Sequence, residues 1–541
     1  MNKFIYLLSI YAALCLVFTS CTTDPDPPVD EKYTVSAGLI AEPDRLNPLL
    51  TVSAYSRQVH EKMFHALLDM DPTTYEYIPG LAQSRPEVKE ITEGPHAGGL
   101  SYTYELYDGI NWSDGAPLTV KDVEFAFKIL FNYNIAEATT HRGFYTSIVS
   151  FETDLANPLR FTVTTNEKYI NGEAAINSIQ PLPAHTLDPE NLMAGYTLND
   201  MLTGGKALSE EEPLQQFAKQ ITTAEFTRGG DKLVSSGPYV ITQWLDGQRI
   251  SMSRNTNWWV DKREGGHPSY AAYPDSLVFR IVTDQATAIT ALKDGLIDVL
   301  EPVDAKTFVE LRDQEGGFVK ENFNFYTPDM FAYYFVALNN GDKLLADKKV
   351  RKALAHLVDV KLLIERGFYG LAKTLNGPVL PYRSYYAKDL PMRQLDLEEA
   401  SRLLTEAGWV DTNDDGTLDK EIDGKREDLK LEYIAIPGSR FASILSNILK
   451  DNAEQVGIDI TIVEREFRTM MMEDVATRKY QLYGAGAGGL PIPDDFKQLW
   501  HTESNTPSGT NRVQFGNAET DALIDAIRVE LDEDKRNAMY R

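Results

Sequence analysis

Cysteine is nearly absent from this chain of 541 residues, which contains only two. Cys15 lies inside the apolar N-terminal segment, so a chain that loses this segment keeps Cys21 alone. A single cysteine excludes a disulfide framework. A chain of this length can instead bury a core large enough to stabilise it.

Positive charge is scarce relative to negative charge. The chain has 53 Lys and Arg against 80 Asp and Glu, for a formal net charge of −27. Such a surface repels nucleic acid, and no basic patch with interleaved aromatic residues occurs. We therefore expect no nucleic-acid partner, and we interpret the acidity as a means of keeping a secreted protein soluble.

Signatures of enzyme chemistry are missing as well. No G-x-S-x-G elbow appears, and the spacing of Ser, His and Asp makes no case for a hydrolase. His60 and His65 come close to an H-E-x-x-H motif, but one residue too many separates them, so on a helix they cannot share a zinc ion. We expect His65 to be a core or helix-face residue, and we expect no catalytic residue, metal or cofactor.

The run Gly484–Gly489 matches the dinucleotide pattern G-x-G-x-x-G. That pattern needs a helix to begin there, because the helix N-terminus holds the pyrophosphate. The segment Leu490–Pro493 follows instead, and its two prolines exclude such a helix. We therefore reject nucleotide binding and predict that the small residues let a ligand approach the backbone closely.

An acidic turn resembles the start of an EF-hand loop. Asp411, Asn413 and Asp415 occupy ligand positions one, three and five, and Gly416 occupies position six. Position twelve is Ile422 rather than a bidentate Glu, and no helix pattern follows the glycine. We interpret the turn as an acidic connector, with weak calcium binding as the alternative.

The N-terminus has the features of a secretory signal. Lys3 is the only charge before Cys21, and residues 4–18 are almost wholly apolar but too few to span a bilayer. Phe18-Thr19-Ser20-Cys21 resembles a lipobox, in which Cys21 is lipidated and becomes the mature N-terminus; an ordinary signal with an incidental cysteine is the alternative.

An acidic, proline-rich stretch follows this cysteine, at residues 22–31. It cannot bury apolar surface, so it predicts an extended tether. We expect a signal peptide at 1–20 and the lipidated cysteine with its tether at 21–32. The protein is thus expected to be extracytoplasmic and anchored to a membrane, on the periplasmic side or the cell surface, without crossing it.

The run from Ile110 to Phe127 predicts a turn followed by a capped helix. Ser113-Asp114-Gly115 has turn chemistry, and Thr119 with Asp122 forms a variant capping box. The run closely resembles the signature "W-S-D-G-x-P-(L/F)-T-A-x-D-V-x-F-(A/S)-F" of family 5 solute-binding proteins. That family includes the oligopeptide-, dipeptide- and nickel-binding receptors of ABC importers.

Further runs resemble the same family and follow its order. Glu42–Pro48 is similar to "(E/D)-P-x-x-L-(N/D)-P", and Ser235–Tyr239 to "G-(T/S)-G-P-Y". Asn257–Trp259 is similar to "N-x-x-Y/W-W", and Val350–Asp359 to "V-R-x-A-(L/I)-x-x-A-(I/L)-D". These runs span nearly the whole mature chain, which is therefore identified as a member of the family.

Hydrophobic periodicity and turn residues predict the secondary structure along the chain. Strands are expected at 33–39, 102–106, 159–165, 277–282, 297–300, 429–436 and 458–463, with a hairpin that turns at 246–247. Helices are expected at 53–69, 286–293, 397–407, 441–455 and 520–540.

The resemblance implies an α/β, two-lobed, periplasmic-binding-protein type II-like fold. It has an inserted mixed α/β subdomain, and a hinge between the lobes lets them close on ligand. Lobe I would comprise 33–49 and 178–282, the insert 50–177 and lobe II 283–541. Family members normally run on past a helix like 520–540 and return to lobe I. Here the sequence stops at Arg541 inside a helical pattern, so either the chain is a truncated version or its last part is absent from this sequence. A protein that lacks the return is expected to have an under-packed lobe I.

The resemblance also implies a monomer that captures a small solute, commonly a peptide, and delivers it to ABC permease subunits without covalent chemistry. Peptide-binding members hold the ligand backbone by strand-like hydrogen bonds and its side chains in hydrated pockets. A surface or sensory lipoprotein not coupled to a permease is the alternative. A secreted hydrolase is a further alternative, but it would need a clustered nucleophile and base. The expected ligand-binding residues are Asn47, Ser53, Tyr55, Tyr239, Gly486, Gly488, Gly489, Leu490, Ile492 and Asp494.

The segment 483–496 departs from the pattern of the peptide receptors. Their segment typically reads "W-x-x-D-x-x-D-P-D-x-F", and its first Asp takes the α-ammonium of the peptide. Counting back from Phe496 places Asp494 on the last Asp, Ile492 on the middle one and Gly489 on the first. The usual amine anchor is therefore missing unless Asp494 or Asp495 substitutes for it.

We hypothesise that Leu490, Ile492 and the nearby glycines present an apolar wall. Such a wall would suit a blocked, modified or non-peptide solute. The alternative for Asp494 is that it caps a following helix at 496–500.

Overall fold

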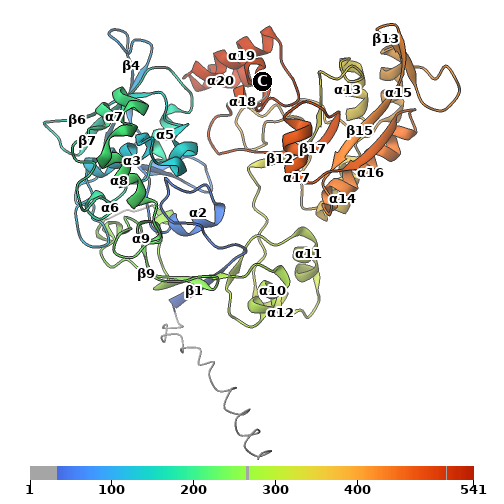
Figure 1. Ribbon diagram of the computed structural model, residues 1–541. Coiled ribbons are helices and arrows are strands. Elements are labelled where there is room, and N and C mark those ends of the chain that lie inside the picture. The colour runs from blue at the N-terminus through green and yellow to red at the C-terminus, as the bar shows by residue number, and fades with distance from the viewer. Residues whose placement is uncertain (1–32, 264–266, 507–508) are drawn as a thin grey trace, which may run out of the picture. The chain divides into compact units, whose positions relative to one another are not determined.

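The computed structural model describes residues 33–263, 267–506 and 509–541 (Figure 1). The expected signal peptide, Cys21 and the tether lie outside the described residues. The chain folds into two compact units. The first contains 33–67, Leu106–Arg142 and Gln180–Glu301, and the second contains Leu68–Glu105, Gly143–Ile179 and Pro302–Arg541. No helix in the described ranges is long and apolar enough to cross a bilayer.

The first unit contains a five-stranded sheet. The strand order is β11 (Val299–Leu300), β1 (Thr34–Leu39), β10 (Ser276–Ile281), β9 (Arg249–Arg254) and β8 (Tyr239–Leu245). β1 lies parallel to both neighbours, whereas β8, β9 and β10 are antiparallel. The hairpin turn at Asp246-Gly247 forms as predicted, with Gly247 at φ +67°.

The helices of the first unit include the one predicted from the capping box. In α3 (Val120–Phe131), the Thr119 hydroxyl caps the first turn and the Asp122 carboxylate accepts a hydrogen bond from the Thr119 N–H at 2.8 Å. Its apolar stripe is fully buried. The other α-helices are α2 (Ala54–His60), α4 (Thr139–Arg142), α6 (Ala184–Leu187), α7 (Leu198–Gly204), α8 (Glu212–Ile221), α9 (Ala224–Thr227) and α10 (Gln285–Lys293).

The helix expected at 53–69 is wrong beyond His60. There the chain leaves the helix, and the carbonyls of Lys62 and Met63 accept hydrogen bonds from the N–H groups of Tyr239 and Gly237. A Cβ on Gly237 would lie 2.8 Å from the Met63 carbonyl carbon, so only glycine permits this approach. A long-range backbone contact thus ends a helix that the local pattern would have continued.

His65, just beyond this break, is a core residue as predicted. Its ring stacks on Trp258 at a centroid distance of 5.9 Å, and the indole Nε1–H of Trp258 donates to His65 Nε2 at 3.2 Å. The neighbouring His60 is also buried, and this burial lowers its pKa to about 4.

The second unit contains two antiparallel sheets from the N-terminal half of the chain. The larger has the order β4 (Glu87–Glu90), β5 (Leu100–Glu105), β7 (Arg160–Thr165) and β6 (Ile148–Thr153), which confirms the two strands predicted at 102–106 and 159–165. The smaller pairs β2 (Leu68–Met70) with β3 (Tyr77–Pro79). Helix α5 (Gly172–Asn177) follows β7.

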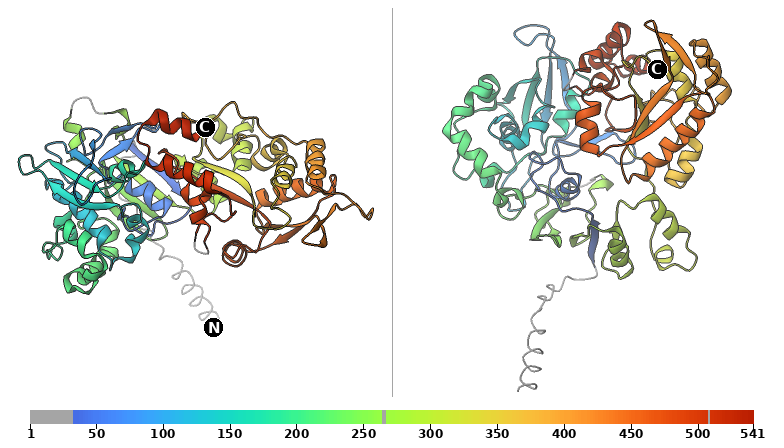
Figure 2. Two further views of the ribbon diagram at one scale, coloured as in Figure 1. Left: turned by 90° about the horizontal axis from the view of Figure 1, so that it is seen from above. Right: turned by 45° about the vertical axis from the view of Figure 1, so that its right-hand side comes forward.

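The main sheet of the second unit has four strands. Their order is β12 (Ala332–Leu338), β17 (Leu482–Gly488), β15 (Lys430–Ala435) and β16 (Asp459–Glu464). Helix α16 (Arg440–Glu454) joins the parallel strands β15 and β16 and packs on them, which confirms the predicted strand–helix–strand unit (Figures 1 and 2). Strands β13 (Asp419–Ile422) and β14 (Lys425–Asp428) form a separate hairpin.

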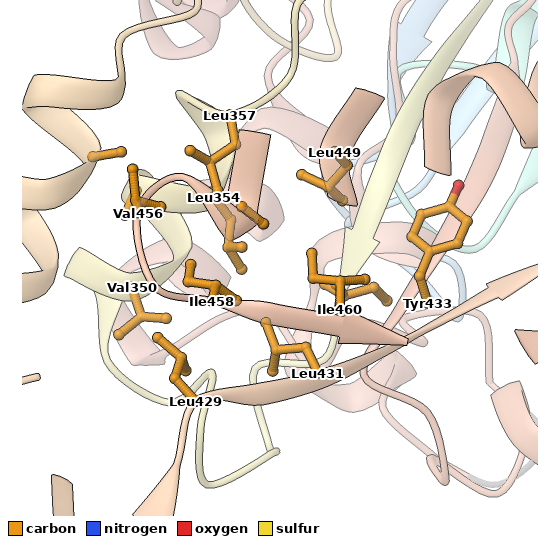
Figure 3. Close-up of a cluster of buried hydrophobic side chains, with 14 of the residues drawn as sticks. Val350, Leu354, Leu357, Leu429, Leu431, Tyr433, Leu449, Val456, Ile458 and Ile460 are labelled. Carbon is orange, nitrogen blue, oxygen red and sulfur yellow. The ribbon is translucent and has the colours of Figure 1, made fainter. Parts of the chain in front are cut away.

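The larger of two buried hydrophobic clusters at the main sheet lies on the face that α16 covers. Leu431 and Tyr433 of β15 and Ile460 of β16 meet Leu449 of α16 (Figure 3). These strand residues share a face because side chains alternate along a strand. Burying each such side chain contributes about 1.5–3 kcal/mol. Three more helices supply this core: α13 (Lys348–Ala355), α14 (Val360–Phe368) and α15 (Leu397–Glu406).

The helix expected at 520–540 forms as two helices. α19 (Ala518–Val529) ends before Glu530, and α20 (Glu533–Tyr540) begins after Asp532. The Asp532 carboxylate accepts a hydrogen bond from the Lys535 N–H at 3.0 Å, which is a new N-cap within an otherwise helical pattern. Shorter helices in this unit are α11 (Ala305–Asp313), α12 (Phe318–Asn322), α17 (Phe467–Thr469) and α18 (Lys497–Trp500).

The acidic turn that resembles an EF-hand uses its side chains on its own backbone. Asp411 Oδ2 accepts from the Gly416 N–H at 2.9 Å, and Asp415 Oδ1 accepts from the Thr417 N–H at 2.8 Å. No group of three His, Cys, Asp or Glu residues within the described ranges is arranged to hold a metal ion. The acidic connector stays the prediction for this turn, and weak calcium binding stays its alternative.

Candidate functional site

Strand β17 has one edge that no strand covers along most of its length. On one side β12 pairs with it completely, from Ala332↔Gly488 to Leu338↔Leu482. On the other side β15 pairs only with Leu482 and Tyr483. Beyond Tyr483, no strand in the described part of the chain pairs with this second edge of β17. Its N–H and C=O groups are a template on which an extended chain can add as a strand.

Three glycines place no side chain on one face of β17. A Cβ on Gly484 would lie 2.8 Å from the Tyr433 hydroxyl oxygen, and one on Gly486 would lie 3.3 Å from the Tyr334 ring. A Cβ on Gly488 would meet no atom within 4 Å. Tyrosine side chains therefore occupy the space where Cβ atoms on Gly484 and Gly486 would lie, whereas the space beside Gly488 is open. The glycine run is a strand, so the helix required for nucleotide binding does not form.

The segment after β17, residues 489–496, is held by main-chain contacts. The Gly489 N–H donates to the Phe331 carbonyl at 2.5 Å, and Arg383 Nη2 donates to the Leu490 carbonyl at 2.6 Å. Leu490 is 55% exposed and Ile492 is half-buried. We refer to residues 489–496 as the anchored segment.

Asp494 lies in an ion pair with Arg383. Its Oδ1 is 2.9 Å from Arg383 Nη2, with the arginine side chain only 9% exposed and the aspartate side chain 21% exposed. The Tyr385 hydroxyl donates to Asp494 Oδ2 at 2.8 Å. Burial, together with the Asp494 charge, raises the pKa of Tyr385, so this hydroxyl stays protonated as a donor. Tyr540 stacks on Tyr385 and donates its hydroxyl to the Asp494 main-chain carbonyl.

This geometry shows that Asp494 is not a helix cap. Helix α18 begins after Phe496 with no side-chain cap. The alternative in which Asp494 caps this helix is therefore wrong. The reason lies in the tertiary structure. The carboxylate of Asp494 is bound by the guanidinium of Arg383, which is 111 positions away in the sequence.

Asp495 is paired as well. Its Oδ2 accepts hydrogen bonds from the Tyr169 hydroxyl at 2.9 Å and from Arg528 Nε at 3.0 Å. Burial and the Asp495 charge raise the pKa of Tyr169 to about 12. Asn171 Nδ2 also donates to the Pro493 carbonyl at 3.0 Å. Both carboxylates of the anchored segment are thus already neutralised within the second unit.

The remaining predicted residues lie in the first unit. Asn47 is fully buried, and its side-chain oxygen accepts from the Leu49 N–H at 3.1 Å. Ser53 caps α2, and Tyr55 is half-buried on that helix. The Tyr239 hydroxyl donates to the Pro274 carbonyl at 3.0 Å. Ligand contact by these four residues stays a prediction.

Sequence reasoning missed the partners of the anchored segment. Arg383, Tyr385, Tyr169 and Arg528 belong to no motif. The only signal for the first two was local composition, since residues 381–386 read Pro-Tyr-Arg-Ser-Tyr-Tyr, which is dense in aromatic hydroxyls.

Comparisons with known proteins agree on one family. The model described as "Bacterial extracellular solute-binding proteins, family 5 Middle" matches residues 76–510. The chain is 23% identical over 530 residues to the oligopeptide-binding protein AppA of Bacillus subtilis, covering 96% of this chain and 86% of AppA. It is 25% identical to protein XP55 of Streptomyces lividans, covering 94% of this chain and 80% of XP55.

Solved structures show the same fold. AppA from Bacillus subtilis with a nonapeptide has a TM-score of 0.62 at 22% identity, covering 94% of this chain and 89% of AppA. NikZ from Campylobacter jejuni with Ni(L-His) has a TM-score of 0.63 at 22% identity, covering 94% of this chain and 88% of NikZ. These likenesses confirm the α/β, two-lobed type II-like fold class.

Removing the Asp494 carboxylate is predicted to destabilise the second unit. Asp494→Ala leaves the buried Arg383 guanidinium without a counter-ion, and breaking such a pair costs about 3 kcal/mol or more. The matched control is Asp329→Ala in the exposed pair Asp329–Lys373, whose side chains are 60% and 69% exposed, with an expected loss below about 1 kcal/mol. Denaturant unfolding of both variants measures the difference. Equal losses would contradict the assignment of a buried pair.

Proposed function

The chain belongs to the bacterial extracellular solute-binding proteins of family 5 and is a solute-binding receptor of an ABC-type importer; we propose that its solute is a peptide-like molecule with a blocked or modified amino end. The role consists of capturing this solute outside the cytoplasm and handing it to the permease subunits. No covalent step is part of it. The protein acts as a monomer that closes on its solute.

The proposal that the solute is peptide-like rests on the open edge of β17. An extended backbone that adds to this edge gains main-chain hydrogen bonds whatever its side chains are. The glycines on β17 leave the approach unobstructed at Gly488. Among the similar proteins, AppA of Bacillus subtilis is described in complex with a nonapeptide, and a Thermus thermophilus protein with a pentapeptide.

The pairing of Asp494 and Asp495 supports a blocked amino end. An α-ammonium taken out of water needs a negative partner, and leaving one member of such a pair alone costs about 2–5 kcal/mol. Asp494 is already bound by Arg383, and Asp495 by Arg528. Neither carboxylate is left over to receive an ammonium group. Leu490 and Ile492 then supply the apolar wall along this segment.

Two other roles make different demands. A hydrolase would need a nucleophile beside a base, whereas the polar side chains around the anchored segment pair with one another. A surface or sensory receptor would use the same site without a permease. A permease gene beside this one favours the importer, and an adjacent outer-membrane or sensor gene favours the other role.

Capture with closure is predicted to be measurable without knowing the solute in advance. Native mass spectrometry of gently purified protein is expected to reveal a retained small molecule. Small-angle scattering with and without that molecule should then show compaction, because the lobes close around it. Turnover of the molecule by pure protein would instead establish an enzyme.

Acetylation of a peptide's amino end is predicted not to weaken binding. Calorimetry with matched free and N-acetylated peptides tests this, and Asp494→Asn should leave the ratio of the two affinities unchanged because Arg383 already holds that carboxylate. Asp329→Asn, which removes the carboxylate of an exposed ion pair, serves as the control for lost charge. A strong preference for free amines that only Asp494→Asn abolishes would refute the blocked-end proposal and restore Asp494 as the amine anchor.

Cys21 is predicted to carry the membrane anchor. Cys21→Ser removes the thiol that would be lipidated, so the protein should leave the membrane fraction or accumulate as an unprocessed precursor. Fractionation and metabolic labelling with a fatty acid measure this. Membrane attachment and label that persist unchanged in the variant would argue for an ordinary signal peptide.

A further inference from the structure

The second unit is assembled from two parts that the chain does not join directly. We refer to Leu68–Glu105 with Gly143–Ile179 as its N-terminal part and to Pro302–Arg541 as its C-terminal part. Every passage of the chain between these parts runs through the first unit. The two buried clusters at the main sheet contain no residue of the N-terminal part. The contact between the parts therefore resembles a domain interface, and motion across such an interface is the usual expectation.

One contact between the two parts is polar and lies at residues 169–171. The Tyr169 hydroxyl donates to Asp495, and Asn171 Nδ2 donates to the main chain of the anchored segment. Between them, the Ile170 N–H donates to the Arg528 carbonyl at 2.9 Å. The Arg528 guanidinium also lies 5.1 Å from the centre of the Tyr169 ring. The N-terminal part thus reaches the anchored segment by hydrogen bonds that can break and form again without unfolding either part.

The other contact is aromatic and lies at the turn between β2 and β3. The Tyr75 ring is 5.0 Å from Phe331 and 5.5 Å from Tyr382, and the last two rings are 5.0 Å apart. Aromatic pairs at such distances attract one another in edge-to-face arrangements. Tyr75 is half-buried although it belongs to a surface turn. The hairpin therefore places a single ring against two rings of the C-terminal part.

The backbone of Tyr75 is strained. Its φ is +61°, in the left-handed region that favours glycine and is rare for a bulky side chain. The turn closes through its own hydrogen bonds: the Tyr75 N–H donates to the Asp71 carbonyl at 2.9 Å, and the Thr73 N–H donates to Asp71 Oδ1 at 2.6 Å. Glycine would make the same turn with less strain. What tyrosine adds at this position is its ring, and this ring packs on the C-terminal part.

The two rings that contact Tyr75 are connected to the anchored segment. The Phe331 carbonyl accepts the hydrogen bond from the Gly489 N–H, where the segment begins. Tyr382 precedes Arg383, whose guanidinium lies 4.8 Å from the centre of the Tyr382 ring and binds the segment further along. A ring that packs on Phe331 and Tyr382 therefore restrains both groups that hold the anchored segment.

We propose that Tyr75 is a latch: its ring joins the two parts of the second unit and thereby orders the anchored segment that follows the open edge of β17. The inference rests on the proposed function, in which the protein closes on its solute, and identifies an element that holds the closed form. Because closure and ordering share the same contacts, a solute that binds at this edge favours closure, and closure favours the solute equally. The strain at Tyr75 opposes the latch and keeps the closed form easy to reopen.

Amide hydrogen exchange of the solute-free full chain, followed by mass spectrometry, tests the latch. Tyr75→Gly removes the ring and relieves the backbone. We expect exchange at 168–172 and 489–491 to become at least fivefold faster, because the N–H groups of Ile170 and Gly489 lose protection when the parts separate. Exchange within β2 and β3 should stay the same or become slower, because glycine suits the turn. Tyr75→Phe keeps the ring and should match the wild type.

Asp423→Gly is the matched control. Asp423 also has a positive φ, +51°, in the exposed turn of the β13–β14 hairpin of the same unit, and it carries no ring. This variant should leave exchange at 168–172 and 489–491 unchanged. Equal effects of the two glycine variants, or exchange in Tyr75→Gly that is faster only within β2 and β3, would overturn the latch. Should Tyr75→Gly not fold, Tyr75→Asn replaces it, since asparagine also tolerates this conformation.

The dissociation rate of a bound peptide separates this inference from the proposed function. The probe is an N-acetylated pentapeptide, which Tyr75→Gly should release at least fivefold faster than the wild type or Tyr75→Phe. If the wild type does not bind the peptide, the proposed class of solute is wrong, and the exchange rates alone decide the latch. If the peptide binds and leaves Tyr75→Gly and the wild type at the same rate, the latch is wrong and the proposed function stands.

Discussion

The lack of side chains on β17 is the constraint to which the rest of the second unit adjusts. This strand lies between β12 and β15 in the main sheet, yet from Gly484 to Gly489 it carries nothing larger than a methyl group. The Tyr433 hydroxyl approaches Gly484, and the Tyr334 ring covers Gly486. Because β15 pairs with β17 only as far as Ile434 and ends at Ala435, no described strand pairs with this edge of the same stretch. One run of small residues thus makes room for two tyrosine side chains and leaves a strand edge open to an extended solute.

Charge pairing then determines what the open edge can recognise. Asp494 and Asp495 follow β17 closely, and both would be candidates for an ammonium group if they were free. Arg383 and Arg528 neutralise them, while tyrosine hydroxyls take further oxygen positions. A largely buried pair such as Arg383–Asp494 adds little net stability, but breaking it is costly, so it holds the anchored segment in one conformation. Recognition at this place therefore relies on the backbone and on apolar contact.

Local signals predicted the elements where tertiary contacts agreed with them. The Thr119 capping box, the Asp246-Gly247 turn and the strand–helix–strand unit at 429–463 all formed as expected. The helix expected at 53–69 ends at His60, because the carbonyls of Lys62 and Met63 accept hydrogen bonds from backbone N–H groups at 237–239, far away in the sequence. The single helix expected at 520–540 forms as two helices, because Asp532 caps the second one although the hydrophobic periodicity continues without a break. In both cases a hydrogen bond outweighed a weak helical preference.

The sequence by itself determined the family, the α/β class and the missing aspartate at Gly489, since these depend on residue identity and order. It also excluded the nucleotide site, because two prolines cannot begin the required helix. Only the tertiary structure decided that Asp494 is bound by Arg383, that one edge of β17 is free and that the turn between β2 and β3 packs on the C-terminal part of the second unit. The physical reason is common to all three. Each depends on groups far apart in the chain that meet only when the second unit folds, and no local pattern records such a meeting.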